Sequence, residues 1–219
     1  MPARTKRPKS PAHPVTVIYV RHGQTPTTGQ VLPGRAPNLH LAESGLAQAQ
    51  AAATELSTVT NVAALYCSPL ERTRETSAPI AKALGLRAKV DKSLIECDFG
   101  DWTGKKLDAL RKLPEWSSVI NSPSTFRFPN GESFVELLER VHNFRNRALA
   151  DHAGKTVIAV THADVIRVAL CDAWGAHLDQ LKRITVGTCS ISIVRYAESG
   201  PVVIAAGIPR AVHELVNPA

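Results

Sequence analysis

The chain has 219 residues, of which 44% are hydrophobic and 21% are charged, and its formal net charge is +7. These proportions are typical of a folded globular protein and exclude a fibrous or wholly disordered chain. No apolar run approaches the roughly 20 residues of a membrane span, and none follows the basic start as in a signal peptide, so we expect no membrane association.

The first 14 residues are rich in proline and basic side chains and contain no acidic residue. We therefore expect a basic disordered tail over residues 1–14 and one domain over residues 15–219. A tail of this kind can bind nucleic acid. The folded part shows no nucleic-acid recognition motif, so we expect no nucleic-acid partner, and deletion of residues 1–13 would test the tail.

The four cysteines form neither a C-x-x-C pair nor a zinc-ligand spacing. Most of the histidines likewise lack a ligand pattern with carboxylates or cysteines. We therefore expect reduced thiols, a cytoplasmic protein and no bound metal.

After the tail, segments typical of strands alternate with segments typical of helices. Strands are expected at Val15–Val20, Ala63–Cys67, Arg87–Val90, Thr156–Val160, Ile191–Arg195 and Val202–Ala206, and helices at Ser44–Leu56, Pro69–Leu84, Ser133–Ala150 and Ala163–Trp174. Glycine and proline predict a long loop over residues 25–40, and residues 94–131 are typical of a substrate-capping segment. The alternation predicts a single-domain three-layer α/β/α sandwich with a mostly parallel central sheet.

Two of the apolar strands run directly into histidines. The first leads into Arg21-His22-Gly23, and the strand at residues 156–160 leads into Thr161-His162. Because ligands of open α/β sheets bind beyond the carboxyl ends of the strands, we expect both histidines at one rim. Two histidines with an arginine suit the handling of a phosphoryl group through a histidine nucleophile.

Four segments carry a family resemblance: residues 21–25 (RHGQT), 68–76 (SPLERTRET), 96–104 (ECDFGDWTG) and 160–167 (VTHADVIR). Together, in this order and spacing, they resemble the histidine phosphatase superfamily, which includes the cofactor-dependent phosphoglycerate mutases, fructose bisphosphatases and small phosphatases. The resemblance covers roughly residues 15 to 206 and implies a phosphoglycerate mutase-like fold. It also implies an enzyme with no cofactor whose partner is a small phosphorylated metabolite or inorganic phosphate.

The resemblance implies three catalytic residues. His22 would be the nucleophile that forms a phosphohistidine, and Glu96 would be the general acid and then the general base. For that role the pKa of Glu96 would need to be raised by partial burial. His162 would be a further donor to the phosphoryl oxygens.

The resemblance also implies a set of phosphate-binding residues, namely Arg21, Gly23, Thr28, Arg72 and Ala163. Arginine suits this role because its guanidinium is a permanent, forked donor. For Arg74 and Arg167 we expect salt bridges or surface exposure instead. For Glu132, at the start of a helix, we expect a structural role.

The chain departs from the mutase pattern at two places. Thr27-Thr28 stands where mutases carry Trp-Asn, and Cys97 stands where they carry an arginine. The run Glu-x-x-Phe-Gly-x-Trp-x-Gly is instead that of the phosphatase branch. We therefore expect a phosphatase of small phosphomonoesters, and the alternatives are a phosphomutase or a non-catalytic module that binds a phosphorylated ligand.

Substrate selection is expected to fall to the loop at 25–40 and the segment at 94–131. The candidates for an apolar wall are Phe99, Trp102, Phe126 and Phe128, and those for a second anion site are Arg35, Lys105, Lys106 and Arg127. The sequence names no physiological substrate, and it leaves a homodimer open.

Overall fold

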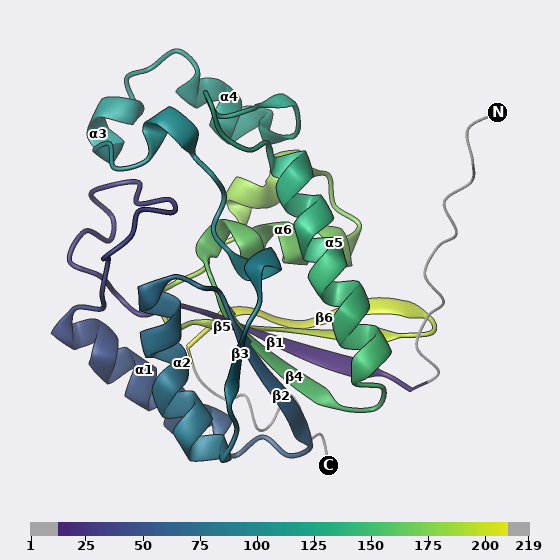
Figure 1. Cartoon of the computed structure of the whole chain (residues 1–219). Helices are drawn as coiled ribbons and strands as arrows, with labels where there is room; N and C mark the ends of the chain where they lie inside the picture. Colours follow the sequence, from purple (N-terminus) through teal and green to yellow (C-terminus); the bar gives the residue numbers. More distant parts are fainter. Residues whose placement is uncertain (1–12, 210–219) are drawn as a thin grey trace.

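A six-stranded sheet organises the molecule in the computed structural model, which describes residues 13–209. The strand order is β3-β2-β4-β1-β5-β6 (Figure 1). The strands are β1 (Val15–Arg21), β2 (Val62–Cys67), β3 (Ala88–Val90), β4 (Thr156–Thr161), β5 (Ile191–Ala197) and β6 (Gly200–Ile208). The first four are parallel to one another, whereas β5 and β6 form an antiparallel hairpin beside β1. The predicted mostly parallel sheet is confirmed, and the expected tail falls largely outside the described residues.

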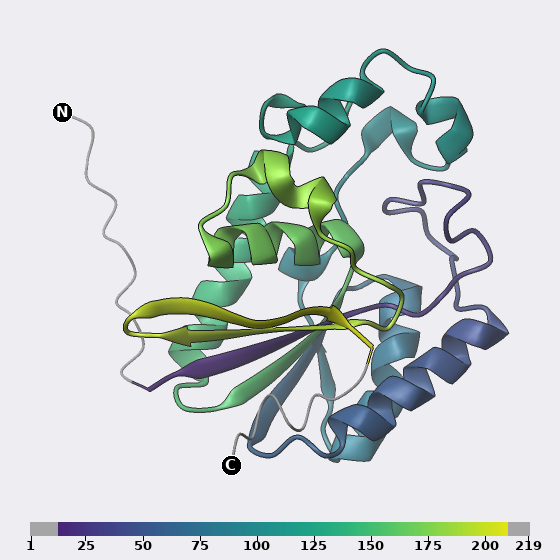
Figure 2. The same cartoon turned by 180° about the vertical axis from the view of Figure 1, so that it is seen from behind.

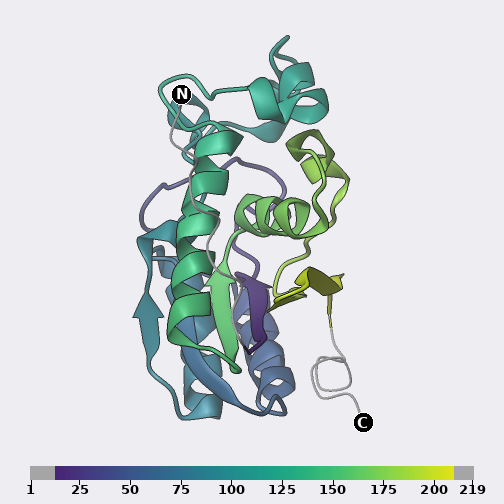
Figure 3. The same cartoon turned by 90° about the vertical axis from the view of Figure 1, so that its right-hand side faces the viewer.

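The alternation of side chains along β1 separates two hydrophobic cores. Val17 and Tyr19 pack with α5 (Phe134–Asp151) and α6 (Ala163–Trp174) on one face of the sheet. Ile18 and Val20 point to the other face, where α1 (Glu43–Leu56) and α2 (Glu71–Leu84) cover the sheet. Figures 1 and 3 show the two helix pairs on opposite sides of the strands, as the sandwich prediction requires.

Local signals in the sequence set most helix ends. Ser133 caps α5 by accepting from the Glu136 N–H while Glu136 binds back to the Ser133 N–H, a capping box. Gly85 and Gly175 end α2 and α6 in the left-handed conformation that glycine adopts without strain. The predicted start of α2 at Pro69 is two residues early, because Pro69 and Leu70 have not yet entered the helix.

A separate layer of short helices lies beyond the rim of the sheet (Figure 2). Its elements are the 3-10 turns η2 (Gly100–Trp102) and η3 (Pro123–Thr125), with α3 (Leu107–Leu110) and α4 (Trp116–Asn121), whereas the 3-10 turn η1 (Lys92–Leu94) packs against α5 and β4 in the body of the molecule. The loop at 25–40 is joined to this layer by backbone hydrogen bonds, among them Leu32 N–H to Lys105 O at 2.9 Å and Gly104 N–H to Leu32 O at 2.7 Å. The two segments that the sequence links to substrate selection are therefore one connected structure.

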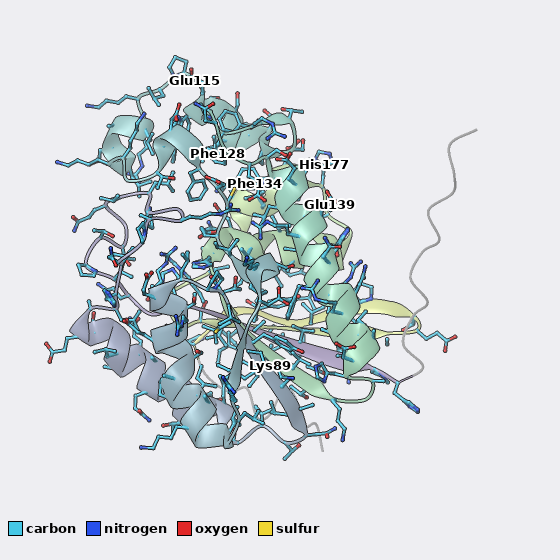
Figure 4. The ribbon with its side chains drawn as sticks, in the orientation of Figure 1. Lys89, Glu115, Phe128, Phe134, Glu139 and His177 are labelled. Atoms are coloured by element: carbon cyan, nitrogen blue, oxygen red, sulfur yellow. The ribbon has the colours of Figure 1, made fainter. Side chains whose placement is uncertain are left out.

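An aromatic cluster anchors this layer to the body of the molecule. Phe128 lies against Phe134 of α5 with their ring centroids 5.6 Å apart, and Figure 4 shows the two side chains where the layer meets the helix. Trp102 stacks on Trp116 at 6.1 Å. A further 3-10 helix, η4 (Leu178–Arg183), follows α6 and contacts it. Within residues 13–209, no helix is both long and apolar enough to span a membrane.

Candidate active site

Two neighbouring strands bring the two motif histidines together. Strands β1 and β4 pair in parallel with Arg21 opposite Thr161, so the next residue of each chain segment emerges at the same rim. The rings of His22 and His162 lie edge to face with centroids 5.2 Å apart. The expectation that both histidines reach one rim is confirmed.

A hydrogen bond of His22 determines which of its ring nitrogens is free to act as a nucleophile. Its Nδ1 lies 2.8 Å from the carbonyl oxygen of Gly23, and since a carbonyl only accepts, Nδ1 carries the proton. The lone pair is then on Nε2. Burial, reinforced by Arg72 and Arg21, lowers the pKa of His22 from 6.5 to about 3. The imidazole is therefore neutral at physiological pH, which is the state that a nucleophile needs.

Two arginines, one buried and one half-buried, hold buried nitrogens without partners at this rim. Arg72 is fully buried and donates from Nη2 to the carbonyl oxygen of Gly34 at 2.7 Å, yet its Nε and Nη1 have no partner within the described residues. Arg21 donates from Nη1 to the carbonyl oxygen of Val186 at 2.7 Å, and its buried Nε is also unpartnered there. Buried N–H groups of this kind are costly unless an acceptor arrives, so the pair is prepared for an anion.

Glu96 supplies the carboxyl group of the site. Its Oε1 accepts from the Cys97 N–H at 2.9 Å, and its Oε2 lies 4.0 Å from His162 Nδ1. Burial, with the nearby charge of Asp164, raises the pKa of Glu96 from 4.5 to about 7. A carboxyl group with this pKa can both give and take a proton near neutrality.

Asp164 is a second carboxylate that the motif reading left without a role. Burial works against its ionisation, but Lys182 and Arg167 lower the pKa of Asp164. Its Oδ1 accepts from Arg167 at 2.8 Å and from Lys182 at 3.1 Å. Asp164 therefore stays ionised and helps to keep Glu96 protonated.

A pocket of about 350 Å³ opens in front of these groups. The site candidates that line it are Arg21, His22, Thr28, Glu96 and Ala163. A family model described as the histidine phosphatase superfamily (branch 1) matches residues 17–208. The chain belongs to the histidine phosphatase superfamily.

Relatives and solved structures agree with this assignment. The phosphoserine phosphatase 1 of Hydrogenobacter thermophilus is 30% identical over 195 residues, which cover 87% of this chain and 90% of that protein. A probable phosphoglycerate mutase of Yersinia pestis is 30% identical over 186 residues, covering 84% and 86% of the two chains. A mycobacterial glucosyl-3-phosphoglycerate phosphatase structure has a TM-score of 0.79 at 21% identity and covers 89% of this chain and 99% of that one, which shows the shared fold.

Some relatives are longer than this chain. A bifunctional protein of Mycobacterium tuberculosis is 34% identical over 203 residues, which cover 90% of this chain but 56% of that protein. The chain thus spans about half the length of that relative.

Gly23 has a different role from the one expected. Its N–H donates to Thr76 Oγ1 at 3.0 Å and is not free for a phosphoryl oxygen, so the phosphate-binding expectation is corrected. A Cβ at Gly23 would lie 2.6 Å from the Gly45 carbonyl oxygen. The absence of a side chain therefore lets the strand end pack against the first turn of α1.

Thr28 and Ala163 lie in the wall of the pocket. The Thr28 hydroxyl accepts from the Thr25 N–H at 2.9 Å and lies 3.0 Å from Thr25 Oγ1, so it orders the loop. Ala163 is the first residue of α6, which has no side-chain cap. The first N–H groups of a helix without a cap suit an anion.

None of the four basic residues expected at a second anion site lines the pocket. Arg35 is engaged by Asp98 and Glu132, both at 3.1 Å, and Arg127 is engaged by Glu136. Besides Arg21, the basic residues that line the pocket are Arg111, Arg167 and Lys182, which the sequence did not single out for a second anion. Arg167 also forms the salt bridge that we expected for it.

The proposed aromatic wall is also mostly wrong. Only Phe99 lines the pocket, while Trp102 and Phe128 are buried in the aromatic cluster and Phe126 packs against it. The structural role expected for Glu132 is confirmed, because its carboxylate binds Arg35 and Arg140 and accepts from the Asp98 N–H at 3.2 Å. Over residues 13–209, no cluster of three or more His, Cys, Asp or Glu side chains has the geometry of a metal site.

Proposed function

We propose that this histidine phosphatase hydrolyses phosphomonoesters through a phosphohistidine on His22. The observation that carries the proposal is the pairing of a neutral His22 with the unpartnered buried nitrogens of Arg72 and Arg21. The guanidinium groups would bind the phosphoryl oxygens and stabilise the charge of the transition state.

The reaction runs in two steps. In the first, His22 Nε2 forms a bond to phosphorus, the ester P–O bond breaks, and Glu96 gives its proton to the departing alkoxide. In the second, water attacks the phosphohistidine and loses a proton to Glu96, the N–P bond breaks, and inorganic phosphate leaves. Glu96 ends protonated, as it began, so the cycle closes.

His162 completes the phosphoryl site in this proposal. It is fully buried and contacts Arg72, with Nδ1 3.3 Å from Arg72 Nη2. Residues 94–131 would cap the substrate, because Glu96, Phe99 and Trp116 from this segment line the pocket. The reaction needs no metal, and we expect EDTA to leave turnover unchanged.

The chain's own residues favour hydrolysis over phosphoryl exchange between hydroxyls. Cys97 is buried and follows Glu96, where the mutase pattern has an arginine, and the next residue, Asp98, is engaged by Arg35. The 30% identity to a phosphoserine phosphatase supports the same reading. Because a probable phosphoglycerate mutase is equally similar, isomerisation of 3-phosphoglycerate is measured beside hydrolysis.

The test is phosphate release from p-nitrophenyl phosphate and a panel of phosphomonoesters, with acid-labile phosphoprotein trapped by rapid quench. We expect His22→Ala to lose both turnover and the phosphoenzyme. His177→Ala is the matched control, since that histidine is 67% exposed at the start of η4 (Figure 4). Turnover by His22→Ala near the wild-type rate would refute the assignment.

A further inference from the structure

The part of the pocket away from the arginines is walled by apolar side chains. Val31 and Leu32 come from the loop at 25–40, and Leu107, Trp116 and Ile120 come from α3 and α4. Ile120 is 38% exposed and is among the residues that line the pocket. Leu32, Leu107 and Trp116 also pack against the core, and their remaining surface, together with Ile120, faces whatever occupies the pocket.

The pocket has few neutral groups that recognise hydroxyls. Its lining contains no Asn, Gln, Ser or Tyr, and its side-chain hydroxyls are those of Thr25 and Thr28. Those two hydroxyls lie 3.0 Å from each other, and Thr28 Oγ1 also accepts from the Thr25 N–H. A polyol that contacts the apolar wall would lose hydrogen bonds to water that the wall side chains do not replace.

Three basic groups of the lining already have ion-pair partners. Arg111 donates to Asp108 at 2.7 Å. Arg167 and Lys182 share the carboxylate of Asp164. Recognition by hydrogen bonds is therefore concentrated at the phosphoryl end, and recognition at the other end falls to apolar contact.

We propose that this site selects phosphomonoesters whose alcohol part is apolar, an alkyl chain or an aromatic ring, over esters of polyols and amino acids. As a statement about substrates, the inference rests on the proposed function. The binding preference itself can be measured without turnover. Ile120, Trp116 and Leu107 are the residues that set the preference.

Apolar burial gives the expected size of the effect. Each methylene that leaves water for the wall should tighten binding about two- to fourfold. Adding two hydroxyls to the same carbon chain should weaken binding at least about tenfold, because the wall offers them no partner.

The experiment is calorimetric titration of the full chain with phosphonates, whose C–P bond cannot be transferred. Methyl-, butyl- and hexylphosphonate vary the apolar length, and 3,4-dihydroxybutylphosphonate differs from butylphosphonate only by two hydroxyls. We expect Kd to fall along the alkyl series and to be at least about tenfold higher for the dihydroxy compound.

Two variants test the wall itself. Ile120→Ser should flatten the alkyl series while leaving the Kd of methylphosphonate unchanged. Val135→Ser is the matched control, since Val135 is 51% exposed on α5 and does not line the pocket, and it should keep the wild-type series. An alkyl series that is flat in the wild type, or a dihydroxy compound that binds as tightly as butylphosphonate, overturns the inference.

Turnover of hexyl phosphate and p-nitrophenyl phosphate, measured in parallel, separates the two proposals. Chain-length-dependent binding with no phosphate release would refute the hydrolysis and uphold the preference. Phosphate release with a flat binding series would uphold the hydrolysis and refute the preference.

Discussion

The ring of His162 is fixed from behind by Ser68: Nε2 lies 2.8 Å from the hydroxyl oxygen, and both residues are fully buried. On the other side, Nδ1 lies 3.3 Å from Arg72 Nη2, and a guanidinium can only donate. Nδ1 therefore accepts, and Nε2 holds the proton that it donates to Ser68. A hydroxyl can also donate, so Ser68 can support the opposite tautomer, in which Nδ1–H faces a phosphoryl oxygen once Arg72 turns to the phosphate.

Replacing Ser68 should impair catalysis without unfolding the protein. In Ser68→Ala the buried Nε2–H loses its acceptor and the second tautomer loses its donor, so we expect kcat/KM to fall about tenfold. Nitrogen-15 NMR of the histidine rings should show a changed tautomer population at His162. Ser190→Ala is the control, since Ser190 is also buried and its Oγ has no partner in the described residues. Equal rates for the two variants would remove Ser68 from the mechanism.

The pH profile should show the acid role of Glu96. Because its pKa is raised to about 7, the protonated form that serves the leaving group is lost as pH rises through about 7. His22, with a pKa of about 3, stays neutral over the same range. We expect kcat/KM for alkyl phosphates, which reports formation of the phosphoenzyme, to fall above about pH 7 and to be nearly level from there down to about pH 4.

Glu96→Gln is the variant that tests this assignment. It should abolish the alkaline limb and slow alkyl phosphates more than p-nitrophenyl phosphate, whose leaving group needs no proton. Equal losses for the two substrates would show that Glu96 is not the general acid.

The same carboxyl group should make the enzyme less stable at high pH. A raised folded-state pKa means that Glu96 favours folding fully below its unfolded value of 4.5, and this contribution is lost as pH rises through about 7. Glu96→Gln cannot ionise, so the variant should gain in Tm relative to the wild type as pH increases from about 4.5 to 8. A difference in Tm that is independent of pH would contradict the raised pKa.

The placement of His22 and His162 at one rim could be predicted from the sequence because its signals are local. The β-branched run before Arg21 and the one before His162 specify two buried strands, and the parallel arrangement carries the residues after them to one edge. The same reasoning could have placed Ser68 at this rim, because Ser68 directly follows β2, the strand that pairs with β4.

The pocket wall could not be predicted, because it depends on contacts between distant segments. Arg35 lies in the predicted selectivity loop, but its charge is taken up by Glu132, which is 97 residues away in the chain. Trp116 faces the pocket because the short helices fold back over the rim, whereas Phe128 turns into the core against α5. Composition marks such a segment as aromatic and basic, but only packing decides which side chains reach the ligand.

Arg72 should not tolerate even a conservative substitution. Arg72→Lys keeps the positive charge but loses the forked donors that leave Nε and Nη1 free beside His22. We expect kcat/KM to fall about a hundredfold or more and the affinity for orthovanadate to weaken in parallel. Arg74→Lys, at an exposed position two residues along the same helix, is the control and should leave kcat/KM and the affinity for orthovanadate unchanged. Wild-type vanadate binding by Arg72→Lys would separate this residue from the phosphoryl site.

Substitution of Gly45 should reduce activity strongly, although Gly45 takes no part in the reaction. A Cβ at this position would lie 2.0 Å from the Gln24 carbonyl oxygen and 2.9 Å from the Gln24 nitrogen, both backbone atoms that cannot turn aside. Gly45→Ala must therefore push away the segment that carries His22, and we expect a loss of about 2 kcal/mol or more in unfolding free energy together with reduced kcat. Gly187→Ala is the matched control, because its nearest neighbour would be the Ser190 Cβ at an ordinary 3.8 Å. The test is urea unfolding and phosphate release measured on both variants. A Gly45→Ala protein as stable and active as Gly187→Ala would show that the close approach of the two backbones is dispensable.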